Sequence, residues 1–182
     1  RDVERSRGLG DVYKRQELRE DRGEIEAALQ GKLPKLVEYD EIKGDGHLHS
    51  KYSDGSASLE EIVAKAEALG LSWIAVCDHS QSLKVAGGLS IEDLFKKKRH
   101  IEEINKRSHK VKLIFGSEVD ILSDGSLDYP DEVLKEIEFV IAAIHTGFQQ
   151  DEKQLTHRIV SALKHPLVHA IAHPTGRVLG ER

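Results

Sequence analysis

The chain has 182 residues, of which 38% are hydrophobic, so it can bury the core of one ordinary domain. Its formal net charge of −5 at pH 7 argues against a protein that binds nucleic acid through a broad basic surface. A nucleic-acid contact would have to be local, with bound cations supplying positive charge. The single cysteine, Cys77, excludes a disulfide within the chain and favours a reducing cytoplasm. No apolar stretch has the length of a membrane span, and the sequence shows no signal-peptide pattern.

The first 43 residues differ in character from the rest of the chain. Residues 1–16 are strongly charged and show no amphipathic period, and the sequence contains no methionine. We therefore expect a non-native or disordered leader on a fragment of a longer protein. Residues 17–43 are expected to be a linker whose segment 17–30 predicts a helix, ended by Gly31 with Pro34 just beyond it.

From residue 44 onward one unit repeats, in which a short apolar strand leads to a polar residue and then to a helix. We expect strands at 44–50, 72–77, 111–115, 138–144 and 168–172. Helices are expected from Ser58, with Glu61 completing a capping box, to residue 69; from Ser90 to 107; after the loop 123–130; and over 152–163.

The apolar runs show no polar alternation, which is typical of strands covered on both faces in a parallel sheet. The fold class is therefore α/β. An open doubly wound sheet and a partial TIM-like barrel both fit this pattern. We favour a barrel that lacks its C-terminal units, because a closed ring brings the strand ends to one point.

The first strand carries two histidines that alternate with a leucine. Period-two geometry places Asp45, His47 and His49 on one face, with Leu48 on the other. Asp54 follows in a YSDG turn that could return its carboxylate to the strand end. An HxH pattern by itself is as easily incidental as functional.

A polar residue with metal-binding capacity follows or ends each later strand. A residue of this kind, taken singly, could be satisfied by a loop amide. Its recurrence on every strand instead predicts a metal site at one rim of the barrel. These residues are His79, Glu118, His145 and His173.

The remaining histidines are assigned no role, because a solvated or core position explains each of them. They are His100, His109, His157, His165 and His169.

Mixed histidine and carboxylate ligation without a thiolate suits Zn²⁺, Mn²⁺ or Fe²⁺. The ligands are too many for one ion, so we expect two or three cations, with Glu118 as a bridge. Such a cluster activates water and neutralises charge on phosphate oxygens, which predicts phosphoester hydrolysis. Cys77 is expected in the core.

Three further residues are candidates for supporting roles. Asp45 and Asp78 are expected to hold imidazoles in the required tautomer, with structural salt bridges as the alternative. Arg177, and less favourably Lys84, could grip a phosphate, although both could equally be solvated.

Five motifs together resemble the polymerase and histidinol phosphatase (PHP) domain family: GDGHLHSKYSDG, VCDHS, GSEVDI, AAIHTG and IAHPTGR. The segments ELREDRGEIEAA and SLKVAGGLSIEDL are similar to the branch found in bacterial family X DNA polymerases. The resemblance implies a distorted seven-stranded (β/α) barrel with a trinuclear metal site over residues 44–182. It also implies a Mn²⁺-stimulated 3′-5′ exonuclease, with abasic-site cleavage in some members, that acts on DNA in repair beside a polymerase domain. The positions that match metal ligands are His47, His49, Asp54, His79, Glu118, His145 and His173.

The sequence departs from the family pattern at its end, because no Asp-x-His motif follows before Arg182. We therefore expect the chain to lack at least one complete metal site and to be weakly active or inactive beside its parent. Oligomeric state is not predicted.

Three rival functions fit parts of the sequence. The first is a stand-alone PHP phosphatase for a small phosphomonoester such as histidinol phosphate, against which the linker helix argues. The second is a metal-dependent amidohydrolase, for which a bridging lysine would be expected where Glu118 stands. The third is a metal-binding module that braces a polymerase without catalysis.

Overall fold

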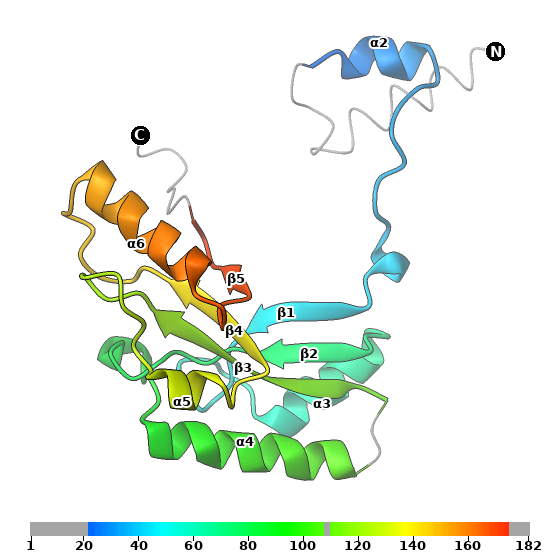
Figure 1. Cartoon of the computed structure of the whole chain (residues 1–182). Helices are drawn as coiled ribbons and strands as arrows, with labels where there is room; N and C mark the ends of the chain where they lie inside the picture. The colour runs from blue at the N-terminus through cyan, green and yellow to red at the C-terminus, as the bar shows by residue number, and fades with distance from the viewer. Residues whose placement is uncertain (1–21, 108–109, 175–182) are drawn as a thin grey trace. The chain divides into compact units, whose positions relative to one another are not determined.

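The computed structural model describes residues 22–107 and 110–174 (Figure 1). The chain divides into two compact units, residues 1–42 and 43–182. In the first unit, helix α2 (Glu24–Leu29) ends before Gly31, whose positive φ of 66° permits the turn, and a 3-10 helix η2 (Tyr39–Glu41) follows. The helix expected over 17–30 is confirmed from Glu24 onward, whereas residues 17–21 lie outside the described part.

The second unit is built on a parallel sheet whose strands follow one another in chain order. The strands are β1 (Gly44–Leu48), β2 (Trp73–Val76), β3 (Lys112–Asp120), β4 (Phe139–Ala143) and β5 (Ala170–Ile171), paired in the order β1-β2-β3-β4-β5. Doubly wound sheets reverse their strand order, so this sequential order excludes them. The sheet curls into a half-barrel (Figure 1), and among the described strands pairing runs from β1 to β5 without closing a ring.

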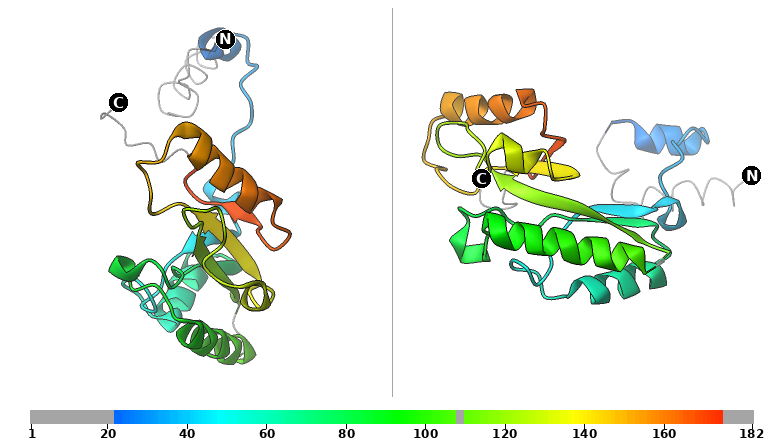
Figure 2. Two further views of the ribbon diagram at one scale, coloured as in Figure 1. Left: turned by 60° about the vertical axis from the view of Figure 1, so that its left-hand side comes forward. Right: turned by 60° about the horizontal axis from the view of Figure 1, so that its bottom comes forward.

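Two helices begin at the capping residues that the sequence predicted. Ser58 and Glu61 form the expected capping box at α3 (Leu59–Ala68), and Ser90 accepts a hydrogen bond from the amide of Asp93 at the start of α4 (Ile91–Lys106). The other helices are η3 (Lys84–Ala86), α5 (Asp131–Leu134) and α6 (Glu152–Lys164). Figure 2 shows α3 and α4 side by side along the sheet. None of the helices in the described ranges is long and apolar enough to cross a membrane.

The sheet separates a large core from a smaller one. Along β2 and the residue after it, Ile74 and Val76 pack into the large core beneath α3 and α4, whereas the alternate residues Ala75 and Cys77 belong to a small inner cluster. Burial raises the pKa of the Cys77 thiol to about 12, so Cys77 remains a protonated core residue. Small inner side chains leave room on the concave face of the sheet for functional groups.

Strand β3 extends beyond its expected end. We predicted a strand over 111–115, but the chain continues extended to Asp120, because Gly116 to Asp120 pair with β4 after Lys112 to Phe115 pair with β2. A Cβ at Gly116 would lie 2.6 Å from the Cys77 sulfur, so this crossing point requires a glycine. Glu118 therefore lies within a strand and not in a loop after one.

Candidate metal centre

The segment after β1 folds back on itself and returns Asp54 to the strand end. The amides of Ser53 and Gly55 both donate to the Ser50 carbonyl, at 3.1 and 3.0 Å. The Oδ1 atom of Asp54 consequently lies 2.7 Å from Nδ1 of His49. The turn has the geometry that the YSDG sequence predicted.

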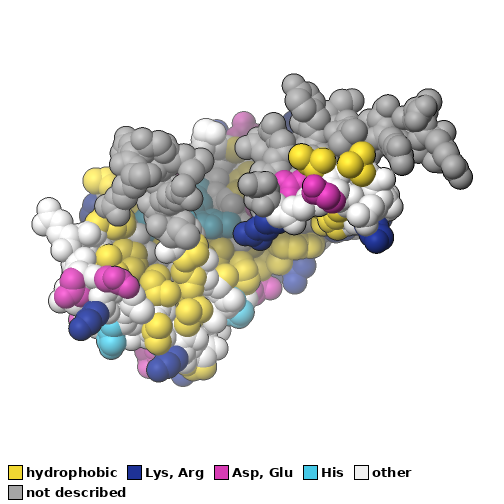
Figure 3. Space-filling view, turned by 90° about the horizontal axis from the view of Figure 1, so that it is seen from above, with side chains coloured by type: hydrophobic (Ala, Val, Ile, Leu, Met, Phe, Trp, Pro, Cys, Tyr) yellow, Lys and Arg dark blue, Asp and Glu magenta, His cyan; other side chains and the backbone are white. Residues whose placement is uncertain are grey.

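Glu118 lies at the centre of the candidate site, with 1% of its surface exposed. Its two carboxylate oxygens lie 3.0–3.5 Å from a ring nitrogen of each of five imidazoles, two from β1 and its end and one each from the ends of β2, β4 and β5: His47, His49, His79, His145 and His173. The structure thus brings all seven predicted ligands together on one side of the sheet. The side chains of His47 and His173 are more exposed to solvent than the other three imidazoles. Figure 3 shows histidine side chains (cyan) at the surface of the face it draws.

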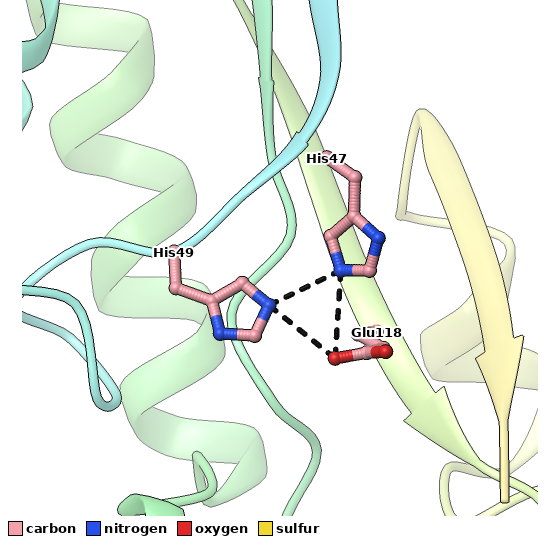
Figure 4. Close-up of side chains that lie close together, drawn as sticks. All are labelled: His47, His49 and Glu118. Carbon is pink, nitrogen blue, oxygen red and sulfur yellow. Dashed lines mark hydrogen bonds and ion pairs between the residues drawn. The ribbon is translucent and has the colours of Figure 1, made fainter. Parts of the chain in front are cut away.

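Two imidazoles face each other directly across the site. The Nε2 atoms of His47 and His49 lie 3.1 Å apart, and both point toward Oε2 of Glu118 (Figure 4). Two ligand atoms held tetrahedrally about 2.0–2.1 Å from one zinc ion lie about 3.3 Å apart. The spacing of these nitrogens therefore suits a shared divalent cation.

Three overlapping groups of side chains have ligand atoms that all lie within 4.8 Å of one another. Because each group shares members with the others, neighbouring cations would be linked by common ligands. Nδ1 of His79 is buried 3.1 Å from Oε2 of Glu118 but makes no hydrogen bond among the described residues, an arrangement that suits two ligand atoms of one cation. The groups are His47, His49 and Glu118; His49, Asp54 and His79; and His79, Glu118 and His145.

The charges of the site favour cation binding. Burial opposes ionisation of Glu118, but hydrogen bonds from His145, His47 and His49 outweigh it and hold the pKa of the carboxyl far below its usual range. Burial lowers the pKa of His79, so this imidazole is neutral at pH 7. His145 differs: burial lowers its pKa, but hydrogen bonds to Asp120 and Glu118 raise it to about 9. A cation at His145 therefore replaces a proton.

Asp120 belongs to the site but was not among the predicted residues. Its Oδ1 atom lies 2.5 Å from Nδ1 of His145, and its Oδ2 atom accepts a hydrogen bond from the Ser82 hydroxyl at 2.9 Å. Asp120 thereby orients His145 so that Nε2 faces Glu118. The signal was the spacing Glu118-x-Asp120, which places both carboxylates on one face once the strand extends through them.

Replacing Asp120 with asparagine is expected to weaken metal binding by about 10- to 100-fold, because loss of the carboxylate frees the ring of His145. Isothermal titration of the purified protein with Mn²⁺ measures the change. Asp124→Asn, in the exposed turn after β3, is the matched control and should bind as the unmodified chain does. Equal affinity of the Asp120 variant would contradict this role.

Of the four residues predicted to support the ligands or to bind phosphate, the three that the structure describes form no hydrogen bond or ion pair with an imidazole ring. Asp78 bonds to the Ser50 and Ser53 segment and to Lys97, 3.0 Å away, and its described contacts include no imidazole. The salt-bridge alternative therefore describes Asp78 better. Asp45 is exposed and accepts a hydrogen bond from the amide of His47 at 3.0 Å. Arg177 lies outside the described residues, and Lys84 lies exposed in η3.

The histidines without a predicted role have other partners or lie elsewhere. His100 bonds to Tyr52 and Glu60, His165 contacts Asp131, and His169 accepts a hydrogen bond from the amide of Val140. His157 lies on α6, and His109 is outside the described residues.

The sequence profile of the PHP domain matches residues 45–180, so the chain belongs to the PHP domain family. Over 166 residues it is 42% identical to the DNA polymerase/3′-5′ exonuclease PolX of Bacillus subtilis, a match that covers 91% of this chain and 29% of that protein. It is 32% identical over 134 residues to a probable phosphatase of Acetivibrio thermocellus, covering 71% of this chain and 53% of that one. The chain thus spans about a third to half of these curated relatives.

A solved structure supports the fold. The histidinol phosphate phosphatase of Lactococcus lactis, crystallised with zinc, L-histidinol and phosphate, superposes with a TM-score of 0.50 at 20% identity. The superposition covers 72% of this chain and 57% of that one. The curled parallel sheet is therefore the architecture of a PHP protein, and at this identity the likeness concerns the fold alone.

Proposed function

We propose that this chain is the metal-dependent phosphoesterase part of a DNA-processing protein and hydrolyses phosphodiester bonds of DNA from the 3′ end. The observation that carries the proposal is the convergence of five imidazoles on the buried, ionised carboxylate of Glu118. An isolated buried carboxylate would be costly, and this arrangement offers it two or three cations as partners.

The residues of the site have distinct tasks in this proposal. Divalent cations, Mn²⁺ or Zn²⁺, would supply Lewis acidity toward phosphate oxygens and lower the pKa of water. Glu118 would bridge neighbouring cations, while Asp54 and the imidazoles hold them from the sides. Asp120 keeps the Nε2 atom of His145 aimed at the site. Arg177 is retained as a candidate to grip a phosphate beside the cations.

DNA as the substrate is supported by the extent of the similarity to PolX. That match covers 91% of the chain and so includes residues that precede the PHP-matched range 45–180. The net charge of −5 requires that cations, and not a basic surface, attract the phosphates. We further propose a polymerase domain in the parent protein, a role in DNA repair that could include abasic sites, and a cytoplasmic location.

A phosphatase acting on a small phosphomonoester is the second candidate. It is favoured by the 32% identity to the probable phosphatase of Acetivibrio thermocellus and by the likeness in fold to a histidinol phosphate phosphatase.

The two candidates differ in their preferred substrate. The purified chain is supplied with Mn²⁺ and incubated either with a 5′-labelled single-stranded oligonucleotide or with histidinol phosphate. We expect stepwise shortening of the oligonucleotide, slow beside that by the longer parent protein, that EDTA stops and that the His79→Ala variant lacks, because that variant removes one ligand. Faster phosphate release from histidinol phosphate would favour the second candidate. DNA cleavage that His79→Ala retains would contradict the proposal.

A further inference from the structure

Lys97 occupies an unusual position on the buried face of α4. It follows Leu94 by three residues and precedes Ile101 and Ile104 by four and seven, which are positions that face a core. Its side chain is completely buried, as are those neighbours. An ammonium group in such a place is costly unless each of its protons finds an acceptor.

All three donors of Lys97 Nζ are satisfied. The acceptors are the carbonyl of Val76 at 3.1 Å, the carbonyl of Gly116 at 2.9 Å and Oδ2 of Asp78 at 3.0 Å. The two carbonyls lie where β3 leaves β2 and begins to pair with β4. The Nζ atom of Lys97 thus connects β2 and β3 at the point where the two strands separate, just before His79 and Glu118 in the chain.

Asp78 connects Lys97 to the loop that carries the ligands His49 and Asp54. Its Oδ1 atom accepts hydrogen bonds from the amide of Ser50 at 2.8 Å and the hydroxyl of Ser53 at 2.7 Å, and its Oδ2 atom accepts one from the Ser50 hydroxyl at 2.9 Å. Ser50 directly follows His49, and Ser53 directly precedes Asp54. Asp78 itself directly precedes His79.

We propose that the buried Lys97–Asp78 pair is a positioning device that fixes loop 49–54 against His79, so that His49, Asp54 and His79 can share one cation. These three ligands form one of the candidate metal groups, and each is a chain neighbour of an atom in the Asp78 network. A buried ion pair adds little net stability compared with apolar side chains of equal volume, so stability alone explains it poorly. The inference rests on the proposed metal centre.

The test compares two variants with matched controls in the full chain, using Co²⁺ as the probe. Lys97→Met keeps the length and bulk of the side chain but removes the anchor. Ser53→Ala removes a 2.7 Å bond to Asp78 and a longer, 3.4 Å bond to Asp54, while retaining every ligand side chain and the core. Ile104→Ala, on the same buried face of α4, and Ser126→Ala, in an exposed turn, are the controls. Co²⁺ affinity, the visible spectrum of bound Co²⁺ and the melting temperature are measured for each protein.

We expect Lys97→Met and Ser53→Ala to bind Co²⁺ about tenfold or more weakly and with an altered spectrum. Ile104→Ala should melt at a lower temperature yet retain the affinity and spectrum of the unmodified chain. If Lys97→Met does not fold, the Co²⁺ affinity of Ser53→Ala tests the positioning role. Unchanged binding by Ser53→Ala, or an equal loss in Ile104→Ala, would overturn the positioning role while leaving the centre intact. An unmodified chain that binds no Co²⁺ would overturn the centre itself.

Discussion

Replacing Glu118 with glutamine is expected to abolish the metal cluster and lower Mn²⁺-dependent phosphoester hydrolysis by more than about a hundredfold. Glu118 contributes to two of the three candidate metal groups, so one substitution affects both. Glutamine has nearly the same volume, but its amide carries no charge and cannot bridge two cations through two equivalent oxygens. The imidazoles would then face one another without the anion that their arrangement surrounds.

Metal analysis after dialysis, together with hydrolysis of the labelled oligonucleotide, measures this effect. Because the substitution conserves volume, the variant should remain folded, which its circular dichroism verifies. Glu136→Gln is the matched control, since Glu136 is exposed and pairs only with Lys98, 2.6 Å away, among its described contacts. A Glu118 variant that retained the metal content of the unmodified chain would exclude Glu118 as the bridging ligand.

The elements of the fold were largely predictable because their signals are local. Ser58 and Ser90 specify helix starts through hydrogen bonds to amides three residues ahead, and those bonds need no information from elsewhere in the chain. The apolar runs specify strands buried on both faces, as β2 and β4 are. Four of the ligand positions followed from the rule that the carboxyl ends of parallel strands meet at one edge, while the full set of seven also needed the resemblance to the PHP family.

What the sequence did not reveal depends on partners distant in the chain. The strand that carries Glu118 was expected to end at residue 115, because the polar letters of GSEVD resemble a loop and only pairing with β4 keeps them extended. Asp120 was missed for the same reason. The run KKKRH does not distinguish Lys97 from Lys96 and Lys98, and only the contacts of Lys97 with β2, β3 and Asp78 set it apart.

Replacing Gly55 with alanine is expected to disrupt the metal site without removing any ligand. A Cβ at this position would lie 2.2 Å from the carbonyl oxygen of His49 and 2.7 Å from the amide nitrogen of Ser50, and backbone atoms cannot rotate away as a side chain can. The loop would have to open, at a cost of about 3 kcal/mol in the free energy of unfolding. Opening the loop separates Asp54 from His49, so Co²⁺ affinity should fall together with the melting temperature.

Gly46, in the same motif, provides the control for Gly55. The nearest side-chain or backbone atom to a Cβ at Gly46 is 4.0 Å away, on Trp73, so Gly46→Ala meets only an ordinary contact and should change stability by less than about 1 kcal/mol. Both glycines lie in GDGHLHSKYSDG, yet only Gly55 is required by the turn that brings Asp54 to His49. Wild-type Co²⁺ binding by Gly55→Ala would mean that the loop tolerates opening, and the close packing of this turn would then have no part in holding the cation.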